Sequence, residues 1–129
     1  MSGKPGPRLL AENPPAPVAT IKSPRELDSM RAAGKVVALT MKAILGALEP
    51  GITTMELDRI ARREIKALGA KPSFLGYPGP YPYPAVICVS LNEEIVHGIP
   101  GDRVIRDGDL VKIDAWAVVD GFHGDHAVS

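Results

Sequence analysis

The sequence predicts an α+β domain in which two amphipathic helices pack on one face of an antiparallel sheet. Two capping signals each precede helical periodicity between residues 21 and 69, and a β-branched run follows at 85–91. Two further strands are joined by Asp120-Gly121, a dipeptide typical of two-residue hairpin turns. At 129 residues, the chain is long enough for one domain with its own core.

Composition argues against several classes of protein. Lys plus Arg and Asp plus Glu number 15 each, and no long basic stripe occurs, so we expect no nucleic-acid partner. The single cysteine, Cys88, excludes an intramolecular disulfide and suits a reducing compartment. No apolar run approaches the length of a membrane span. We therefore expect a cytoplasmic protein with no membrane partner.

The N-terminal segment, residues 1–20, is rich in proline. It holds five of the thirteen prolines and almost no apolar periodicity, which predicts a disordered or polyproline-like arm. Pro14-Pro15-Ala16-Pro17 fits a P-x-x-P ligand, although a solvated arm is the better interpretation of such a match. The folded region is expected at residues 21–129.

The first predicted helix begins behind Ser23, which can cap it, with Pro24 in its first turn and Glu26 completing a capping box. An apolar stripe then recurs at steps of three and four residues. Its members are Leu27, Met30, Gly34, Val37, Met41, Ile44 and Leu48. Pro50-Gly51 ends the helix, and the stripe is interpreted as core.

The second predicted helix repeats this pattern, with Thr53 as the cap and Glu56 as its partner. Its apolar positions are Leu57, Ile60, Ala61, Ile65 and Leu68. Gly69 suits the left-handed position that closes a helix. The short Pro-Gly turn between the helices predicts an antiparallel pair.

Residues 71–84 alternate prolines with aromatic side chains. Repeated X-Pro pairs should preclude both a helix and a paired strand. A rigid loop of this kind could form the wall of an apolar pocket or could lie flat on the core, and the composition favours neither. A short strand carrying Cys88 follows at 85–91.

The last segment predicts a hairpin that carries two aspartates. If Asp120-Gly121 is the turn, Val119 faces Phe122 and Trp116 faces Asp125. Asp114 then lies diagonally across from Asp125 on one face, with backbones roughly 7–8 Å apart. His123 would share that face.

Two such carboxylates could hold a cation, because a lone buried charge is costly. The alternatives are an ion pair with a Lys or Arg, a solvated strand end at Asp125, or a one-residue register change that separates the two Asp.

Three strings of residues resemble the type I methionine aminopeptidases, a pita-bread metallopeptidase family. They are Ser90-Leu91-Asn92-Glu93-Glu94-Ile95-Val96-His97-Gly98-Ile99-Pro100, Asp107-Gly108-Asp109-Leu110-Val111-Lys112-Ile113-Asp114 and Asp120-Gly121-Phe122-His123-Gly124-Asp125. The S-x-N-E-x-x-x-H-G-I-P pattern and the ten-residue gap between the two Asp are specific in combination. The resemblance covers everything after the proline arm.

The resemblance implies two α+β halves around two divalent metal ions (Co, Mn, Fe or Zn) that are held by two Asp, one His and two Glu. Asp114 and Asp125 match the two Asp, and His97 matches a catalytic, substrate-contacting histidine. Tyr77, Tyr83 and Cys88 match positions that line the methionine side-chain pocket. The implied activity is removal of N-terminal methionine from nascent polypeptides, possibly at the ribosome.

The chain also departs from the family pattern. The proline loop is about three residues longer than usual, which leaves open whether Tyr81 or Tyr83 takes the pocket position. His126 stands where the family has Thr or Ser. The sequence ends at Ser129, so only the N-terminal half is expected here, without the remaining His and Glu ligands. We expect this form to be inactive by itself.

Lys112 shares the parity of Asp114 but matches no family site residue, so its replacement by Ala is expected to matter little.

Two other functional classes compete with the leading one. One is a non-catalytic pita-bread relative that binds a protein or RNA, and the other is a related hydrolase such as a prolidase. Retention of His97, Asp114 and Asp125 disfavours the first of these. The His-Gly-Ile-Pro string and the lack of a large N-terminal domain disfavour the second.

Overall fold

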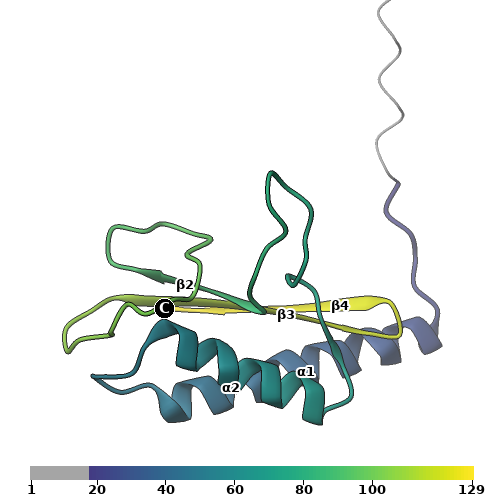
Figure 1. Ribbon diagram of the computed structural model, residues 1–129. Coiled ribbons are helices and arrows are strands. Elements are labelled where there is room, and N and C mark those ends of the chain that lie inside the picture. The colour runs from purple at the N-terminus through teal and green to yellow at the C-terminus, as the bar shows by residue number, and fades with distance from the viewer. Residues whose placement is uncertain (1–17) are drawn as a thin grey trace, which may run out of the picture.

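The computed structural model describes residues 18–129, which form two helices followed by four strands. Both helices lie on one face of a sheet, and two loops rise from the opposite face (Figure 1). This arrangement confirms the predicted α+β class. The proline-rich arm predicted for residues 1–20 falls outside the described residues, apart from 18–20.

The first helix, α1, spans Pro24–Ala47 and begins with the predicted capping box. Glu26 N–H donates to Ser23 Oγ at 3.2 Å, and Ser23 N–H donates back to Glu26 Oε1 at 3.0 Å. The backbone N–H of Ser23 holds the pKa of Glu26 below its usual range. The buried side chains of α1 are Ala33, Val36, Val37, Thr40, Met41 and Ile44.

The first part of the predicted α1 stripe is not core, because Leu27 and Met30 are each 38% exposed. Ser29 Oγ lies 3.3 Å from Asp120 Oδ2, a residue of the hairpin turn. The turns of α1 before Ser29 therefore extend past the end of the sheet, where no strand of residues 18–129 covers them (Figure 1).

The second helix, α2, spans Thr54–Ala67 and buries Leu57, Ala61 and Ile65. Glu56 N–H donates to Thr53 Oγ1 at 3.2 Å. For α2, the structure of residues 18–129 shows this half of the predicted capping box and not the return bond from Thr53 N–H to the Glu56 side chain. Gly69 has a φ of 72°, as expected for the residue that closes a helix.

A buried carboxylate joins α2 to the sheet. Asp58 is fully buried, and its Oδ1 accepts from the backbone N–H groups of Val86 at 2.8 Å and Ile87 at 3.2 Å. Arg62 Nε donates to Asp58 Oδ2 at 2.8 Å, which offsets part of the cost of burying the charge. These bonds fix the start of the strand that carries Cys88.

The sheet is built around β3 (Val111–Val119), with β4 (Phe122–Val128) along one edge. The other edge of β3 is shared by β2 (Ile87–Leu91) and the short β1 (Lys71–Pro72). All pairs are antiparallel.

The hairpin has the predicted register, with Val119 opposite Phe122 and Trp116 opposite Asp125. Positive φ values of 50° at Asp120 and 80° at Gly121 fit the expected turn.

The prediction that the proline loop would contain no paired strand is wrong at its first two residues. Lys71 pairs with Val118 and Pro72 pairs with Ala117. Proline is tolerated there because β1 is an edge strand, where a missing N–H interrupts no further ladder.

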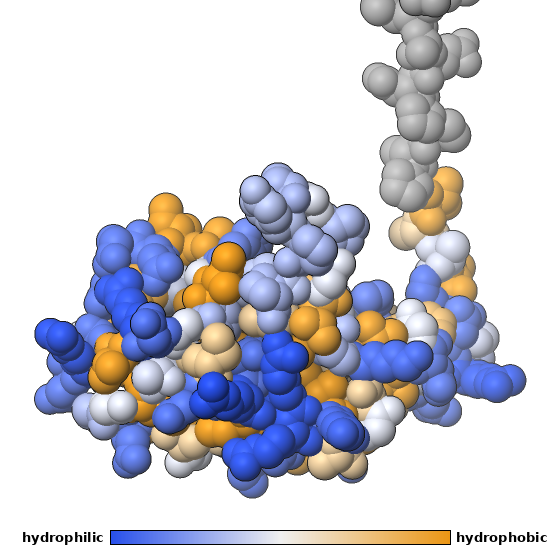
Figure 2. All heavy atoms as spheres, in the orientation of Figure 1, coloured by the Kyte–Doolittle hydropathy of each residue, from blue (hydrophilic) through white to orange (hydrophobic). Residues whose placement is uncertain are grey.

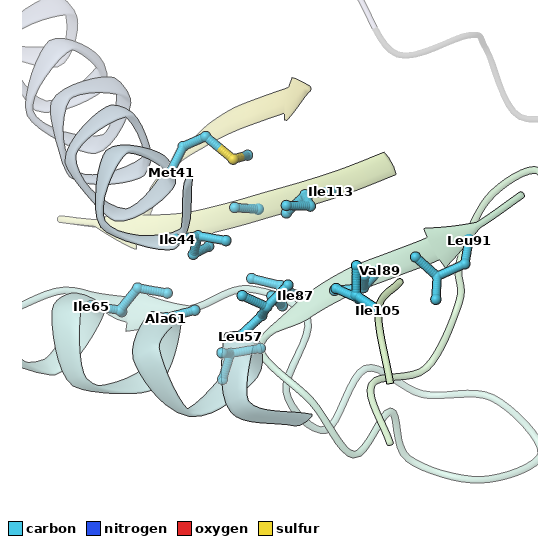
Figure 3. Close-up of a cluster of buried hydrophobic side chains, with 12 residues drawn as sticks. Met41, Ile44, Leu57, Ala61, Ile65, Ile87, Val89, Leu91, Ile105 and Ile113 are labelled. Carbon is cyan, nitrogen blue, oxygen red and sulfur yellow. The ribbon is translucent and has the colours of Figure 1, made fainter. Parts of the chain in front are cut away.

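Alternate residues of β3 face opposite sides of the sheet. Ile113, Ala115 and Ala117 are buried beneath the helices. Ile113 and Ala115 belong to the core drawn in Figure 3, and Ala117 packs in a second cluster with Val36 and Val37. The labelled members of that core are Met41, Ile44, Leu57, Ala61, Ile65, Ile87, Val89, Leu91, Ile105 and Ile113. Each large side chain in it contributes roughly 1.5–3 kcal/mol through burial. The other face of β3 is free for a functional site.

Helix α1 approaches β4 very closely at Gly124. A Cβ at this position would lie 2.5 Å from the backbone carbonyl of Ala33. Only glycine therefore permits this helix-to-strand distance, which explains the Gly between His123 and Asp125. Neither helix of residues 18–129 has the length and apolarity needed to cross a membrane.

Candidate metal centre

A cavity of about 490 Å³ lies between the loops and the helix-free face of the sheet. It is lined by Ser73, Phe74, Tyr77, Tyr83, Cys88, His97, Ile99, Asp114, Trp116 and His123. Five of the six site residues predicted from the sequence are therefore together in one cavity. The sixth, Asp125, is exposed and does not line the cavity, but it lies on the same face of the hairpin.

Asp114 is held in the middle of β3, paired with Cys88 on β2 and Ala127 on β4. Asp125 lies two residues before Ala127 and is thus the diagonal neighbour that the hairpin register predicts. Burial, together with the adjacent carboxylate of Asp125, raises the pKa of Asp114 to about 6. Nearby His97 opposes this rise.

The carboxylate pair fits a divalent cation. Asp114 Oδ1 is buried, and within residues 18–129 it has no hydrogen-bond partner. Two acceptor groups side by side, one with an unsatisfied oxygen, are costly to ionise, and a cation would reverse that cost. Oxygen ligands of this kind suit Mn, Fe, Co or Zn in mixed sites.

The described residues supply only part of a coordination sphere. Among them no group of three or more His, Cys, Asp or Glu side chains is placed to hold a metal. Asp114 and Asp125 are the two that can contribute, and His97, His123 and His126 do not join them in such a group. A stable transition-metal site needs further ligands.

His97 lies on the loop between β2 and β3 and is exposed, with a positive φ of 59°. Its neighbour Gly98 is fastened to β2. Gly98 N–H donates to Ser90 Oγ at 2.9 Å, and Val89 N–H donates to Gly98 O at 2.9 Å. A Cβ on Gly98 would lie 2.1 Å from the carbonyl oxygen of Val89. Gly98 therefore lies against β2 with no room for a side chain, and this close approach fixes the backbone immediately after His97.

The apolar wall of the cavity includes Tyr83, whose Oη lies 2.9 Å from the carbonyl oxygen of Ile87 and 3.3 Å from Cys88 Sγ. Burial raises the pKa of both the Tyr83 hydroxyl and the Cys88 thiol. Tyr81 is 87% exposed and does not line the cavity, so the structure favours Tyr83 over Tyr81. Tyr77 lines the cavity but is 65% exposed.

Several cavity residues were not assigned from the sequence. Phe74 stacks on Trp116, with ring centroids 5.0 Å apart, and is tilted against Tyr83 at 5.7 Å. Ser73 Oγ lies 3.0 Å from Nδ1 of His123. The parity of β3 and β4 indicated that Trp116 and His123 share the face of Asp114, and Phe74 belongs to the aromatic loop that could form a pocket wall, but no local pattern pointed to Ser73.

The loop that carries His97 exposes several apolar side chains. Figure 2 shows hydrophobic side chains exposed on the loop side of the molecule. Ile95, Val96 and Ile99, on the loop that carries His97, are 81%, 65% and 60% exposed.

Comparison with known proteins identifies relatives of this arrangement. Methionine aminopeptidase 1 of Bacillus subtilis is 56% identical over 106 residues, covering 82% of this chain and 42% of the relative. Methionine aminopeptidase 1 of Mycobacterium tuberculosis is 52% identical over 109 residues, covering 84% and 40%. The chain thus spans less than half the length of these relatives.

Solved structures give the same result. The methionine aminopeptidase of Thermotoga maritima superposes with a TM-score of 0.81 at 39% identity, covering 86% of this chain and 44% of that chain. The prolidase of Pyrococcus furiosus, at 20% identity and a TM-score of 0.69, shares the fold. The expected pita-bread fold is therefore confirmed for the part of it present here. The model of metallopeptidase family M24 matches residues 28–129, and the chain belongs to that family.

Proposed function

We propose that this chain contributes half of the active site of a metalloaminopeptidase that removes N-terminal methionine from polypeptides. The observation that carries the proposal is the diagonal pair Asp114 and Asp125 beside a cavity that His97 and an apolar wall also line. The relatives at 56% and 52% identity are both methionine aminopeptidases, which supports the proposal. Since the chain spans less than half of those relatives, the activity of a whole enzyme is part of the proposal.

In this proposal Asp114 and Asp125 hold two divalent cations, which would supply Lewis-acid activation of the scissile carbonyl and of water. The metals are drawn from Mn, Fe, Co and Zn. By resemblance to the family, Asp125 would serve as the ligand that the two cations share. The remaining ligands come from outside the described residues.

The other cavity residues bind and orient the substrate. His97 donates a hydrogen bond to the oxygen on which negative charge develops, as an imidazole at neutral pH can. Tyr77, Tyr83 and Cys88 surround the unbranched thioether side chain, which suits a soft and polarisable wall. The cavity, at about 490 Å³, lies within the range of roughly 300–1,000 Å³ common for small ligands.

The proposed partners are the N-termini of nascent polypeptides, encountered in the cytoplasm and possibly at the ribosome. The balance of 15 basic and 15 acidic residues favours a polypeptide substrate over nucleic acid. No membrane partner is proposed.

Trp116 provides the test, because it is the single tryptophan of the sequence and lines the cavity. Mn²⁺, a paramagnetic quencher, should reduce its fluorescence in the wild-type chain. Asp125→Asn should abolish the quenching, and the matched surface change Asp102→Asn should not. Equal quenching in all three proteins would refute the assignment of the carboxylate pair.

A second measurement separates catalysis from simple binding. The chain is supplied with Mn²⁺ or Co²⁺ and assayed for release of methionine from a short methionyl peptide, where no turnover is expected from two metal ligands alone. Peptide binding is followed by Trp116 fluorescence. Peptide binding that depends on Cys88 and Tyr83 and strengthens with Mn²⁺ supports the proposal. Binding of unrelated polypeptides without metal dependence would favour a non-catalytic relative.

A further inference from the structure

Lys112 has contacts that its sequence position did not suggest. It precedes Asp114 by two residues on β3 and lies on the same face of the sheet. Its Nζ donates to the carbonyl oxygen of Asn92 at 2.9 Å and also to that of Glu94. Both acceptors belong to the loop that leads from β2 to His97, and these contacts are a reason to test the expectation that Lys112 matters little.

Packing alone cannot hold this loop, because Ile95 and Val96 are mostly exposed. Polar contacts fasten it at two points instead. At its end, Gly98 is fixed to β2 by bonds to Ser90 and Val89. At its start, the two Lys112 bonds fix the backbone path, and His97 lies between these two attachments.

Asn92 supplies the foundation for the first attachment. Its φ is 51°, a left-handed conformation that asparagine tolerates better than most residues. Its Oδ1 accepts from Leu110 N–H at 2.9 Å, and its Nδ2 donates to Asp109 Oδ1 at 3.0 Å. The turn is thereby held close to the start of β3, within reach of Lys112.

A second basic residue touches the same loop but acts differently. Arg103 Nη1 lies 3.2 Å from carboxylate oxygens of both Glu93 and Glu94. All three side chains are substantially exposed, and solvent screens such pairs. Lys112 instead bonds to main-chain carbonyls, so it restrains the backbone itself.

We propose that Lys112 is a positioning residue for His97: its ammonium group holds the loop from Asn92 to Glu94 and thereby places the imidazole beside Asp114. The catalytic meaning of that placement rests on the proposed function. The restraint on the loop does not, and it can be measured without turnover.

The experiment compares three variants of the whole chain by amide hydrogen exchange and by NMR of the His97 imidazole. Lys112→Met keeps the apolar stem and removes the charge. Lys112→Arg keeps a cationic donor, and Lys35→Met makes the same change on an exposed face of α1.

The Glu94 N–H donates to Leu91 O at 2.9 Å. In Lys112→Met, exchange at this amide should accelerate about tenfold or more, because the loop opens more easily once no ammonium group holds the carbonyls of Asn92 and Glu94. The His97 ring signals should shift or broaden, while amides paired between β3 and β4 keep their protection. Lys112→Arg should keep most of the wild-type protection at Glu94 and the wild-type His97 signals. Lys35→Met should change neither.

Unchanged Glu94 exchange and unchanged His97 signals in Lys112→Met would overturn the inference. So would a loss of protection spread evenly over the sheet, since that indicates a purely structural role. Failure of the proposed function gives a different result: the loop effects persist while Mn²⁺ leaves Trp116 fluorescence unaffected in every variant.

Discussion

Trp116 on β3 stands directly opposite Asp125 on β4, and this pairing puts Asp125 diagonally across from Asp114 on one face of the sheet. Side chains alternate along each strand, so a shift of one residue would send Asp125 beneath α1. The two-residue turn at Asp120 and Gly121 fixes this register. The candidate site therefore depends on a turn at the far end of the hairpin.

The carboxylate pair should destabilise the metal-free chain. The pKa of Asp114 rises from 3.8 to about 6 on folding, so the folded chain binds the proton more tightly. Stability therefore falls as pH rises from 3.8 to about 6, and it stays lower above that pH. Asp114→Asn should raise the Tm in EDTA at about pH 8 and give little gain near pH 4. Thermal melts test this, with Asp102→Asn as the control, and an equal gain at both pH values would contradict it.

The buried carboxylate of Asp58 should be important for folding. Asp58→Ala leaves the backbone N–H groups of Val86 and Ile87 without their acceptor. The expected loss is about 2–5 kcal/mol in the free energy of unfolding, measured with urea. Asp28 is the matched control, because its ion pair with Arg31 is largely exposed. Asp28→Ala should change stability by less than about 0.5 kcal/mol, and similar losses in both variants would refute this role for Asp58.

Gly98 should not tolerate a side chain. Gly98→Ala places a Cβ 2.1 Å from the carbonyl oxygen of Val89, so the loop or β2 has to move. We expect a loss of about 1–3 kcal/mol and a displaced His97, visible as a shifted imidazole NMR signal. Gly46→Ala provides the contrast, because its Cβ would meet nothing within 4 Å on α1. That variant should gain about 0.5–1 kcal/mol.

The thiol of Cys88 should be unreactive in the folded chain. Burial raises its pKa, so the thiolate that attacks thiol reagents is scarce at neutral pH. Labelling with a disulfide reagent should be slow at pH 7 and should accelerate in urea. A methionyl peptide should slow it further if the peptide occupies the same cavity. Labelling as fast as that of a free thiol would contradict the buried position.

Local signals in the sequence predicted most of the fold. Ser23 and Thr53 marked both helix starts, and the Asp-Gly turn set the hairpin register that brings Asp114 and Asp125 to one face. The exposure of Leu27 and Met30 could not be predicted in this way, because it depends on where a distant sheet ends.

The candidate site was predictable only in part. His97 and the two aspartates stood out by their spacing within recognisable strings. The pairing of Ser73 with His123 joins residues 50 positions apart, and the bonds from Lys112 reach 18 and 20 positions back along the chain. Such contacts arise from the tertiary arrangement, and no local pattern announces them.

The alternation along β3 also makes this domain suitable for engineering. Ile113, Ala115 and Ala117 are committed to the core, whereas Lys112, Asp114 and Trp116 face the loops. A combinatorial library that varies Asp114 and Trp116, while keeping Lys112 and the core residues, would sample new ligand preferences and leave the scaffold intact. Selection could then change what the cavity accepts without first having to rescue folding.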